Sequence, residues 1–295
     1  MSVVIPTFNR SPMVPASIRS VLGQTVATGV ETIVVDDGST DDTVSVLASE
    51  FGDRVRVIGQ ANRGASEARN AGVREARGEW VAFNDSDDVW APDKLEKQFR
   101  FLDAHPDIGL LCGNGIDLTS GARVISPRRA RQLACEGGAS LGEMLIHSYV
   151  RTPTLMVRRD LFLEIGGFDR SLPVCEDSDF FMRALLTHPA AFLDEPLFSM
   201  GRTDDHLGKN SERRCECAIR SLEQLVAQGT GVVDRVGVQR LNKSLAYRYY
   251  RLGRAYEKSG KRGEAEKAFS VAVAKQPYYG RAIFSLWRRR LARAW

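Results

Sequence analysis

Residues 78–95 read GEWVAFNDSDDVWAPDKL and combine several signals of one fold class. Residues 80–83 are a short apolar run that is typical of a buried strand. The polar residues 84–88, which include three carboxylates, follow this run directly, and Pro92 suits the first turn of a helix through residue 104. Open α/β sheets bind ligands at the carboxyl ends of their strands, so we expect a site immediately after residue 83.

The segments around this stretch also alternate between apolar runs and stretches with helical period. Such alternation predicts an α/β fold in which helices cover a central sheet. The expected strands are residues 3–6, 31–36, 55–59, 80–83 and 109–112, and regular structure is expected again from residues 154–157. The expected helices include residues 18–22, 41–51, 66–76, 92–104 and 159–165.

The three carboxylates of residues 85–88 repel one another, so a cation or several backbone donors should lie beside them. Asp85 and Asp87 project alike from a strand end. Oxygen ligands of this kind suit Mg²⁺ or Mn²⁺ that also carries phosphate oxygens. A solvated acidic turn that caps the helix at Pro92 would contain the same residues.

The composition and the charge distribution indicate a globular protein with two parts. The chain has 295 residues, 43% of them hydrophobic and 26% charged, which excludes a wholly disordered, collagenous or membrane-embedded protein. Its net charge of +4 averages two different regions. Residues 1–200 hold 20 Lys and Arg against 28 Asp and Glu, whereas residues 201–295 hold 21 against 9.

The periodicity changes in the same place as the charge. Residues 113–150 show weak periodicity and are expected to form an irregular connection, whereas everything beyond about residue 211 reads as helix. We therefore predict a domain of residues 1–205 and a helical region of residues 206–295, with a boundary close to Arg202.

Residues 245–278 carry the spacing of a tetratricopeptide helix pair, in Tyr249, Leu252, Gly253, Tyr256, Ala265, Phe269, Ala272 and Pro277. One repeat cannot bury its own apolar face, so it should pack on neighbouring helices or on another chain, which would allow an oligomer. Because a single unit makes little concave surface, a structural cap is favoured over a peptide-binding groove.

The last residues combine Phe284, Leu286 and Trp287 with clustered Arg in a stretch that is compatible with a helix. A helix of this composition can bind peripherally to an anionic membrane surface. A final helix that packs its Trp residues over the repeat and exposes its Arg residues would have the same sequence, and both interpretations stay open. No nucleic-acid partner is expected, because no recognisable binding fold accompanies the basic patch.

The cysteines and the first residues bear on the compartment. Five cysteines without a CxxC pair support neither a disulfide framework nor a zinc site. No basic leader with an apolar stretch opens the sequence, and no window approaches the ~18 apolar residues of a spanning helix. We expect a cytoplasmic protein, located at the inner face of the cytoplasmic membrane if its last helix binds lipid.

Five blocks of the sequence resemble the family-2 glycosyltransferases in order and spacing. They are VVIPTFNR (3–10), IVVDDGSTDDT (33–43), NRGASEARNAG (62–72), GEWVAFNDSDDVWAPDKL (78–95) and GGFDRSLPVCEDSDFFMRAL (166–185). The resemblance implies a GT-A, Rossmann-like fold with a mixed central sheet. It also implies a nucleotide-diphospho-sugar donor, with a UDP-sugar as the first expectation, a Mn²⁺ or Mg²⁺ cofactor, and inversion at the anomeric carbon.

The resemblance further implies which residues hold the donor: Pro6, Thr7, Asp37, Asn62, Arg63, Arg69, Asp85 and Arg202. Pro6 and its neighbours would line the nucleoside pocket, and Asp37 would hydrogen-bond the base. Residues 62–70 would form a wall of the nucleotide site, with Arg63 or Arg69 near the pyrophosphate.

The metal would be held mainly by Asp87, with Asp85 and His206 as further candidates. Relatives often place Arg and His in a closing segment such as residues 201–206, where they touch pyrophosphate or metal. Asn84 departs from the family pattern, which more often has an apolar residue there. This departure could alter the geometry of the donor loop without disturbing the carboxylates.

Asp177, in the Glu176-Asp177 pair at a helix start, would be the general base. An acceptor hydroxyl is a poor nucleophile near neutral pH, so a carboxylate must take its proton during attack. Inversion needs one such base on the face opposite the leaving group. Glu176 and Asp179 are alternatives, and a helix N-terminus stabilised by negative side chains would look the same.

The expected function is metal-assisted transfer of a sugar, of the hexosyltransferase type, to a glycan or lipid-linked acceptor in polysaccharide or cell-envelope synthesis. A nucleotidyltransferase would need a glycine-rich phosphate loop near the amino terminus, which the sequence lacks. An adaptor that binds proteins through its helical tail is the other alternative. Such an adaptor would have a degenerate catalytic domain, whereas this sequence retains Asp37, Asp85, Asp87 and Asp177.

Overall fold

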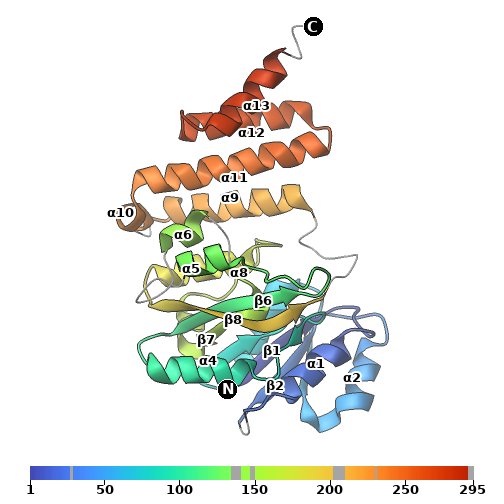
Figure 1. The fold of residues 1–295 in the computed structure, drawn as a ribbon. Helices are drawn as coiled ribbons and strands as arrows, with labels where there is room; N and C mark the ends of the chain where they lie inside the picture. Colours follow the sequence, from blue (N-terminus) through green and yellow to red (C-terminus); the bar gives the residue numbers. More distant parts are fainter. Residues whose placement is uncertain (27–28, 134–140, 147–149, 202–209, 230, 292–295) are drawn as a thin grey trace. The chain divides into compact units, whose positions relative to one another are not determined.

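The structure is a computed structural model that describes residues 1–26, 29–133, 141–146, 150–201, 210–229 and 231–291. The chain divides into two compact units (Figure 1). Unit 1 comprises Met1–Ser140 and Tyr149–Asp204, and unit 2 comprises Leu141–Ser148 and Asp205–Trp295. Unit 2 therefore takes a short segment from the middle of the chain in addition to the C-terminal helices.

Unit 1 is built on a mixed sheet, in which the described residues form eight strands in the order β3-β2-β1-β4-β7-β6-β8-β5. The strands are β1 Ser2–Thr7, β2 Glu31–Asp36, β3 Arg56–Gly59, β4 Trp80–Phe83, β5 Val89–Trp90, β6 Leu110–Asp117, β7 Met156–Arg158 and β8 Ala190–Met200. Strand β1 pairs in parallel with both β2 and β4. The carboxyl ends of these three strands, at Thr7, Asp36 and Phe83, therefore meet at one edge of the sheet.

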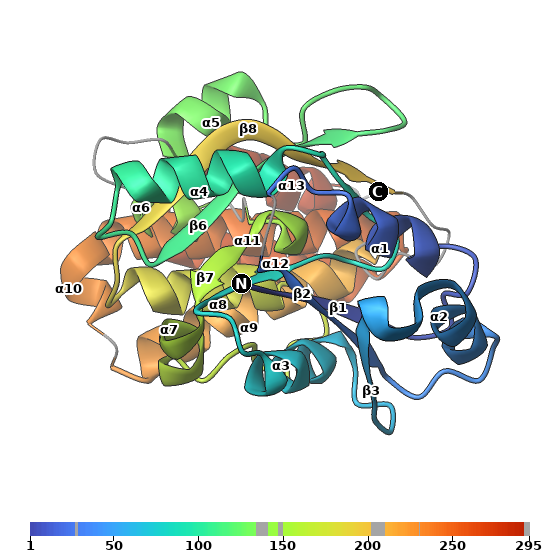
Figure 2. The same cartoon turned by 90° about the horizontal axis from the view of Figure 1, so that it is seen from below.

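Helices cover both faces of this sheet because alternate strand residues are apolar on both sides. The helices of unit 1 are α1 Val14–Leu22, α2 Thr43–Phe51, α3 Ala65–Glu75, α4 Lys94–Ala104, α5 Pro127–Leu133, α7 Arg159–Glu164 and α8 Glu176–Leu185. Val3 and Ile5 share a buried cluster with residues of α1, α2 and α4. Val4 faces α3, where a Cβ on Gly72 would lie 2.4 Å from its Cγ1. Figure 2 shows α1 and α4 on one side of the sheet and α3 and α7 on the other.

Four buried phenylalanines connect the sheet to helices α7 and α8. Phe83 ends β4, and its ring centroid lies 5.6 Å from Phe162 of α7 and 5.2 Å from Phe168. Phe180 of α8 lies 4.8 Å from Phe162. The side chain of Asn70 in α3 donates a hydrogen bond to the Phe168 carbonyl and accepts one from the Phe168 amide, each 2.9 Å long. The start of α8 is thereby fixed close to α3 and to the end of β4.

The helices and strands that the sequence predicts in unit 1 are present, but several of them begin or end at other residues. The helix expected to open at Pro92 begins at Lys94, and residues 152–154 form a short 3₁₀ helix before β7. The stretch 113–150 contains more regular structure than expected. Strand β6 continues to Asp117, and helices α5 and α6 (Leu141–Ile146) follow it.

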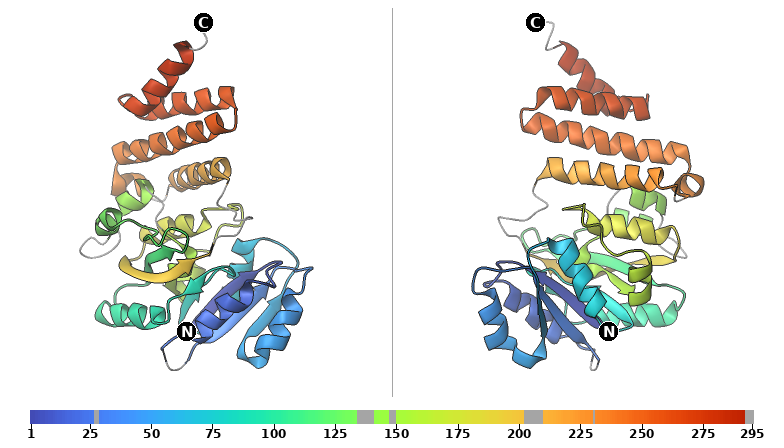
Figure 3. Two further views of the ribbon diagram at one scale, coloured as in Figure 1. Left: turned by 45° about the vertical axis from the view of Figure 1, so that its right-hand side comes forward. Right: turned by 180° about the vertical axis from the view of Figure 1, so that it is seen from behind.

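Within the described residues, unit 2 is helical throughout (Figure 3). Its helices are α6, α9 Ser211–Ala227, α10 Val232–Val236, α11 Val238–Lys258, α12 Arg262–Lys275 and α13 Gly280–Leu291. Helices α11 and α12 form the pair that the tetratricopeptide spacing predicts. Gly253 of α11 lies against the ring of buried Phe269 of α12, where a Cβ would approach a ring carbon to 2.5 Å. Close helix contact therefore depends on a glycine at position 253.

The described part of the chain holds no helix that is long and apolar enough to cross a membrane.

Candidate active site

The ends of β1 and β2 form the first part of the site. The strand pairing continues one residue beyond β2, because the Asp37 amide donates a hydrogen bond to the Thr7 carbonyl at 2.8 Å. The hydroxyl of Thr7 is buried and has no hydrogen-bond partner among the described residues. A buried hydroxyl without a hydrogen-bond partner is uncommon in folded proteins. A ligand bound at this position would supply the missing partner.

The Asp37 carboxylate organises the loop that precedes α3. It accepts hydrogen bonds from the amides of Arg63 at 2.9 Å and Gly64 at 2.8 Å, and from Gln60 Nε2 at 2.7 Å. Gly64 has a φ of 88°, which a residue with a side chain rarely adopts. Asn62 and Arg63 are exposed in this loop. The three donor-side residues predicted at positions 37, 62 and 63 are thus neighbours in the structure.

The acidic turn after β4 is held to helix α1 through Asn84. The buried Asn84 side chain donates to Ser17 Oγ at 2.8 Å and to the Asp88 carbonyl at 3.2 Å. Ser17 Oγ in turn donates to the Asp85 carbonyl at 2.9 Å. Asn84, the departure from the family pattern, therefore shapes the turn through hydrogen bonds that an apolar residue could not make.

The carboxylates of this turn differ in their surroundings. Asp88 is buried and accepts a hydrogen bond from the Gly201 amide at 2.8 Å. Burial, and then the negative charges of Asp85 and Asp87, raise the pKa of Asp88 well above its ordinary value. Asp85 and Asp87 are half-buried. The turn is therefore a region of concentrated negative charge at the carboxyl end of β4.

Arg69 of α3 joins this turn to the start of α8. Its Nη2 lies 2.5 Å from Asp85 Oδ1 and its Nη1 lies 2.7 Å from Glu176 Oε1, and its side chain is only 6% exposed. Burial alone would lower the pKa of Arg69, but the charges of Asp85 and Glu176 outweigh burial and raise it. The Nε of Arg69 is also buried and has no partner among the described residues. Arg69, predicted near the pyrophosphate, thus forms a buried bridge between two carboxylates.

The three acidic residues at the start of α8 have different partners. Glu176 pairs with Arg69, whereas Asp179 accepts a hydrogen bond from Arg183 Nε at 2.8 Å. Asp177 accepts from the Ser178 amide at 2.6 Å and, over 3.5 Å, from Thr152 Oγ1. Among the described residues Asp177 has no ion pair. Burial raises the pKa of Asp177, as it does the pKa of Glu176.

Arg151 is a residue near the site that sequence reasoning missed. Its positive charge opposes the rise that burial causes in the pKa of Asp177, and it also acts on Asp88. The Arg151 guanidinium donates to the Val150 carbonyl at 3.1 Å. Arg151 directly follows the stretch 113–150, and no sequence motif marked it. Arg202 and His206, the remaining predicted site residues, lie outside the described residues.

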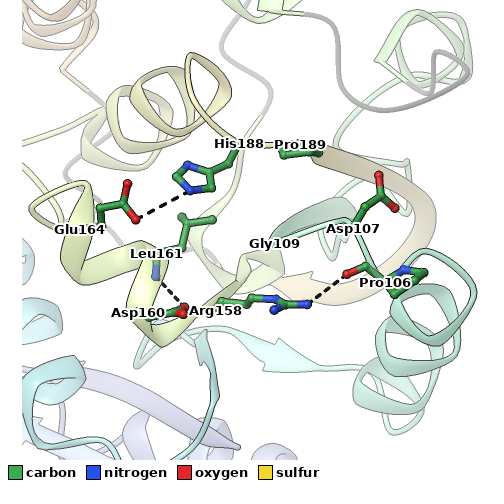
Figure 4. A pocket seen from close by; sticks show the side chains of 9 residues that line it. All are labelled: Pro106, Asp107, Gly109, Arg158, Asp160, Leu161, Glu164, His188 and Pro189. Atoms are coloured by element: carbon green, nitrogen blue, oxygen red, sulfur yellow. Dashed lines mark hydrogen bonds and ion pairs between the residues drawn. The ribbon is translucent and has the colours of Figure 1, made fainter.

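A separate pocket lies at the opposite edge of the sheet (Figure 4). Gly109 and Pro189, which line it, precede β6 and β8, so the pocket is at the amino ends of these strands. Arg158 donates to a backbone carbonyl there, and His188 Nε2 lies 3.9 Å from Glu164. None of the predicted site residues lines this pocket.

Sequence comparisons with known proteins find glycosyltransferases. The sequence model for Glycosyl transferase family 2 matches residues 2–165, which is more than half of the chain. An uncharacterized glycosyltransferase of Haemophilus influenzae is 30% identical over 209 residues, which cover 67% of this chain and 66% of the relative. An uncharacterized glycosyltransferase of Rickettsia typhi is 29% identical over 244 residues, covering 82% of this chain and 74% of the relative.

Solved structures share the fold. The crystal structure of S. aureus TarS 1–349 superposes with a TM-score of 0.70 at 22% identity, covering 94% of this chain and 80% of the TarS 1–349 chain. The mannosyltransferase PcManGT from Pyrobaculum calidifontis, in complex with GDP-Man and Mn²⁺, has a TM-score of 0.64 at 20% identity, covering 99% and 79%. The mixed sheet of unit 1 with its flanking helices is a GT-A fold. With residues 2–165 matched by the family model, the chain belongs to glycosyl transferase family 2.

Proposed function

We propose that the protein transfers a sugar from a nucleotide-diphospho-sugar to a hydroxyl of a glycan or lipid-linked acceptor, with inversion at the anomeric carbon. The observation that carries this proposal is the Arg69 bridge, which joins the acidic turn after β4 to the Glu176-Asp177 pair. Donor-side and acceptor-side carboxylates are thereby close enough to act on one substrate pair. A UDP-sugar is the first candidate donor, because TarS was also crystallised with UDP-GlcNAc.

The nucleoside is proposed to bind between the ends of β1 and β2, beside Pro6. The buried Thr7 hydroxyl has no hydrogen-bond partner among the described residues. The Asp37 carboxylate accepts three hydrogen bonds from its loop. Because a carboxylate offers about four lone-pair sites, Asp37 can accept one more bond from an N–H of the base. Exposed Arg63 and Asn62 border this position.

A divalent cation, Mn²⁺ or Mg²⁺, is proposed to bind at Asp87 with Asp85 nearby. The donor set fits, since hard cations prefer carboxylate oxygens and the turn concentrates negative charge. In the ranges that the structure covers, no three His, Cys, Asp or Glu side chains are grouped so that they could hold an ion. Diphosphate oxygens and water would therefore supply most of the ligands. A cation there would neutralise the charge that develops on the leaving diphosphate.

Asp177 is proposed as the general base. Its two rivals are engaged with arginines, Glu176 with Arg69 and Asp179 with Arg183. The raised pKa of Asp177 makes its carboxylate a better proton acceptor than an exposed one. In the step, the acceptor oxygen bonds to the anomeric carbon, its proton passes to Asp177, and the bond to the diphosphate oxygen breaks.

Calorimetric titration of UDP into the protein, with and without Mn²⁺, tests the donor site. We expect binding in the presence of Mn²⁺ that weakens at least about tenfold when EDTA removes the metal, since the cation offsets the repulsion between diphosphate and turn. GDP, which has the same diphosphate on a different base, is titrated for comparison with UDP. Failure of both nucleotides to bind in Mn²⁺ would contradict the proposed donor site, and equal binding of UDP without metal would contradict the role of the cation.

Arg69 allows a test that does not depend on turnover. Arg69→Met should lower the free energy of unfolding of the protein by about 3–5 kcal/mol, because Glu176, whose side chain is only 13% exposed, would lose its counter-charge. The measurement is urea unfolding followed by circular dichroism. Arg19→Met is the matched control, since the Arg19–Glu50 pair is largely exposed and should contribute less than about 1 kcal/mol. Equal losses in the two variants would show that the Arg69 bridge contributes no more than a surface pair.

A further inference from the structure

The outer side of α13 exposes large apolar residues. Phe284 is 60% exposed, Trp287 is 58% exposed and Ile283 is 42% exposed. Their spacing of one and four residues puts them on one side of a helix, and the rings of Phe284 and Trp287 lie 6.3 Å apart. We call these three residues the aromatic face. Burial of these side chains would be favourable, and the described residues leave them largely uncovered.

Small residues attach α13 to the rest of unit 2. Ala282 and Ser285 are buried, with exposed fractions of 0% and 3%, while the aromatic face points away from them. Packing of the Trp residues over the repeat, one of the two interpretations of the sequence, would bury Trp287, which is mostly exposed; Trp295 lies outside the described residues. A helix that buries its small residues and exposes its large apolar ones is typical of an interaction surface.

The charge around the aromatic face restricts that partner. The sequence of α13 has Arg at positions 281, 288, 289 and 290 and no acidic residue, and no Asp or Glu occurs anywhere in residues 267–295. Arg281 is exposed, and Arg288 is 57% exposed beside Glu257. A second copy of the same face would bring these positive charges together, and like charges repel. An anionic surface that can also accept aromatic rings satisfies both features.

We propose that the aromatic face of α13 docks on an anionic membrane surface. The rings would enter the headgroup region while the arginines contact the phosphates of acidic lipids. The helix would lie in the plane of the surface, because its 12 residues span only about 18 Å against about 30 Å for a bilayer core. This inference concerns unit 2 alone and does not depend on the proposed transferase activity.

Vesicle cosedimentation with the full chain tests the proposal. The protein should bind vesicles made of equal parts phosphatidylcholine and phosphatidylglycerol, and bind vesicles of phosphatidylcholine alone at least about tenfold more weakly. Raising the salt concentration should weaken binding to the mixed vesicles, because salt screens the arginines. The double variant Phe284→Ser, Trp287→Ser should bind the mixed vesicles at least about tenfold more weakly than the wild type, since 1.4 kcal/mol of lost burial already equals tenfold.

Two further variants control for folding and for nonspecific effects. Val238→Ser removes an apolar side chain that is 57% exposed at the start of α11, and should bind the mixed vesicles as the wild type does. Arg281→Gln changes charge without touching the aromatic face, and should reduce binding by a smaller factor. Absence of wild-type binding to mixed vesicles, or undiminished binding by the double variant, would overturn the proposal. Self-association in analytical ultracentrifugation that the double variant abolishes would assign the face to a second copy instead.

Discussion

Asp177→Asn is expected to slow sugar transfer by about 10²–10⁴-fold while nucleotide binding stays unchanged. The amide keeps the size of the carboxylate but cannot take the acceptor's proton. Because Asp177 is in contact with Ser178 and Thr152 rather than with the donor-side residues, the donor site should keep its affinity. Steady-state transfer rates and calorimetric titration of UDP measure the two effects separately.

The pH dependence gives an independent readout of the same residue. Only the deprotonated carboxylate can accept a proton, and burial raises the pKa of Asp177. On acidification, transfer by the wild type should therefore decline at a higher pH than it would with an exposed aspartate as base. Asp179→Asn is the matched control, because Asp179 bonds to Arg183 and should affect stability more than the pH profile. Normal transfer by Asp177→Asn would reject the assignment and direct attention to Glu176.

Asp87→Asn should abolish metal-dependent transfer, with a loss of at least about 10²–10³-fold, and should weaken UDP binding only when Mn²⁺ is present. The side chain lies in a half-buried turn, so the variant should keep its circular dichroism spectrum and its unfolding midpoint. The same nucleotide titrations, run with Mn²⁺ and with EDTA, give the measurement.

A nearby acidic residue supplies the comparison for Asp87. Asp93 has a side chain that is 44% exposed and pairs with Lys97 on α4. Asp93→Asn also removes one negative charge, but it leaves the proposed metal ligand Asp87 intact. It therefore measures the electrostatic effect of losing a charge by itself. If Asp93→Asn weakened Mn²⁺-dependent binding as much as Asp87→Asn did, a general electrostatic effect would replace the specific ligand role.

The sheet was largely predictable because its central strands are short apolar runs that end in polar turns. Residues 31–36 and 80–83 were expected as strands and are β2 and β4. Strand β6 was expected to end at residue 112 but continues through Gly113 and Gly115 to Asp117. Glycine has low strand propensity, so this stretch read as a loop.

The glycines of β6 are explained by packing that sequence pattern does not reveal. A Cβ on Gly113 would lie 2.4 Å from Leu197 Cδ1, and one on Gly115 would lie 2.2 Å from a ring carbon of Phe198. Strand β8 therefore comes so close to β6 that only glycine fits. The pairing of these two strands is also irregular after Gly113.

The parts of the candidate site were predictable one by one, but their connections were not. Asp85 and Glu176 each stood out in a local motif, yet nothing in the sequence paired them through Arg69, which is 107 residues from Glu176. That bridge depends on the aromatic cluster and on the Asn70 hydrogen bonds to Phe168, which bring α8 towards α3. Local sequence patterns identify residues whose side chains can take part in catalysis or binding. Long-range packing decides which of these residues lie together.

Turnover of nucleotide sugars tests the central claim most directly. The wild type and Asp177→Asn would be incubated in Mn²⁺ with a panel of nucleotide sugars and an extract of lipid-linked and free glycans, and products would be followed by mass spectrometry. We predict that the wild type consumes one donor, releases its nucleoside diphosphate and adds the sugar mass to an acceptor, while the variant does so at least about 10²-fold more slowly. Equal consumption of every donor by both proteins, or none by either, would contradict the proposed transferase.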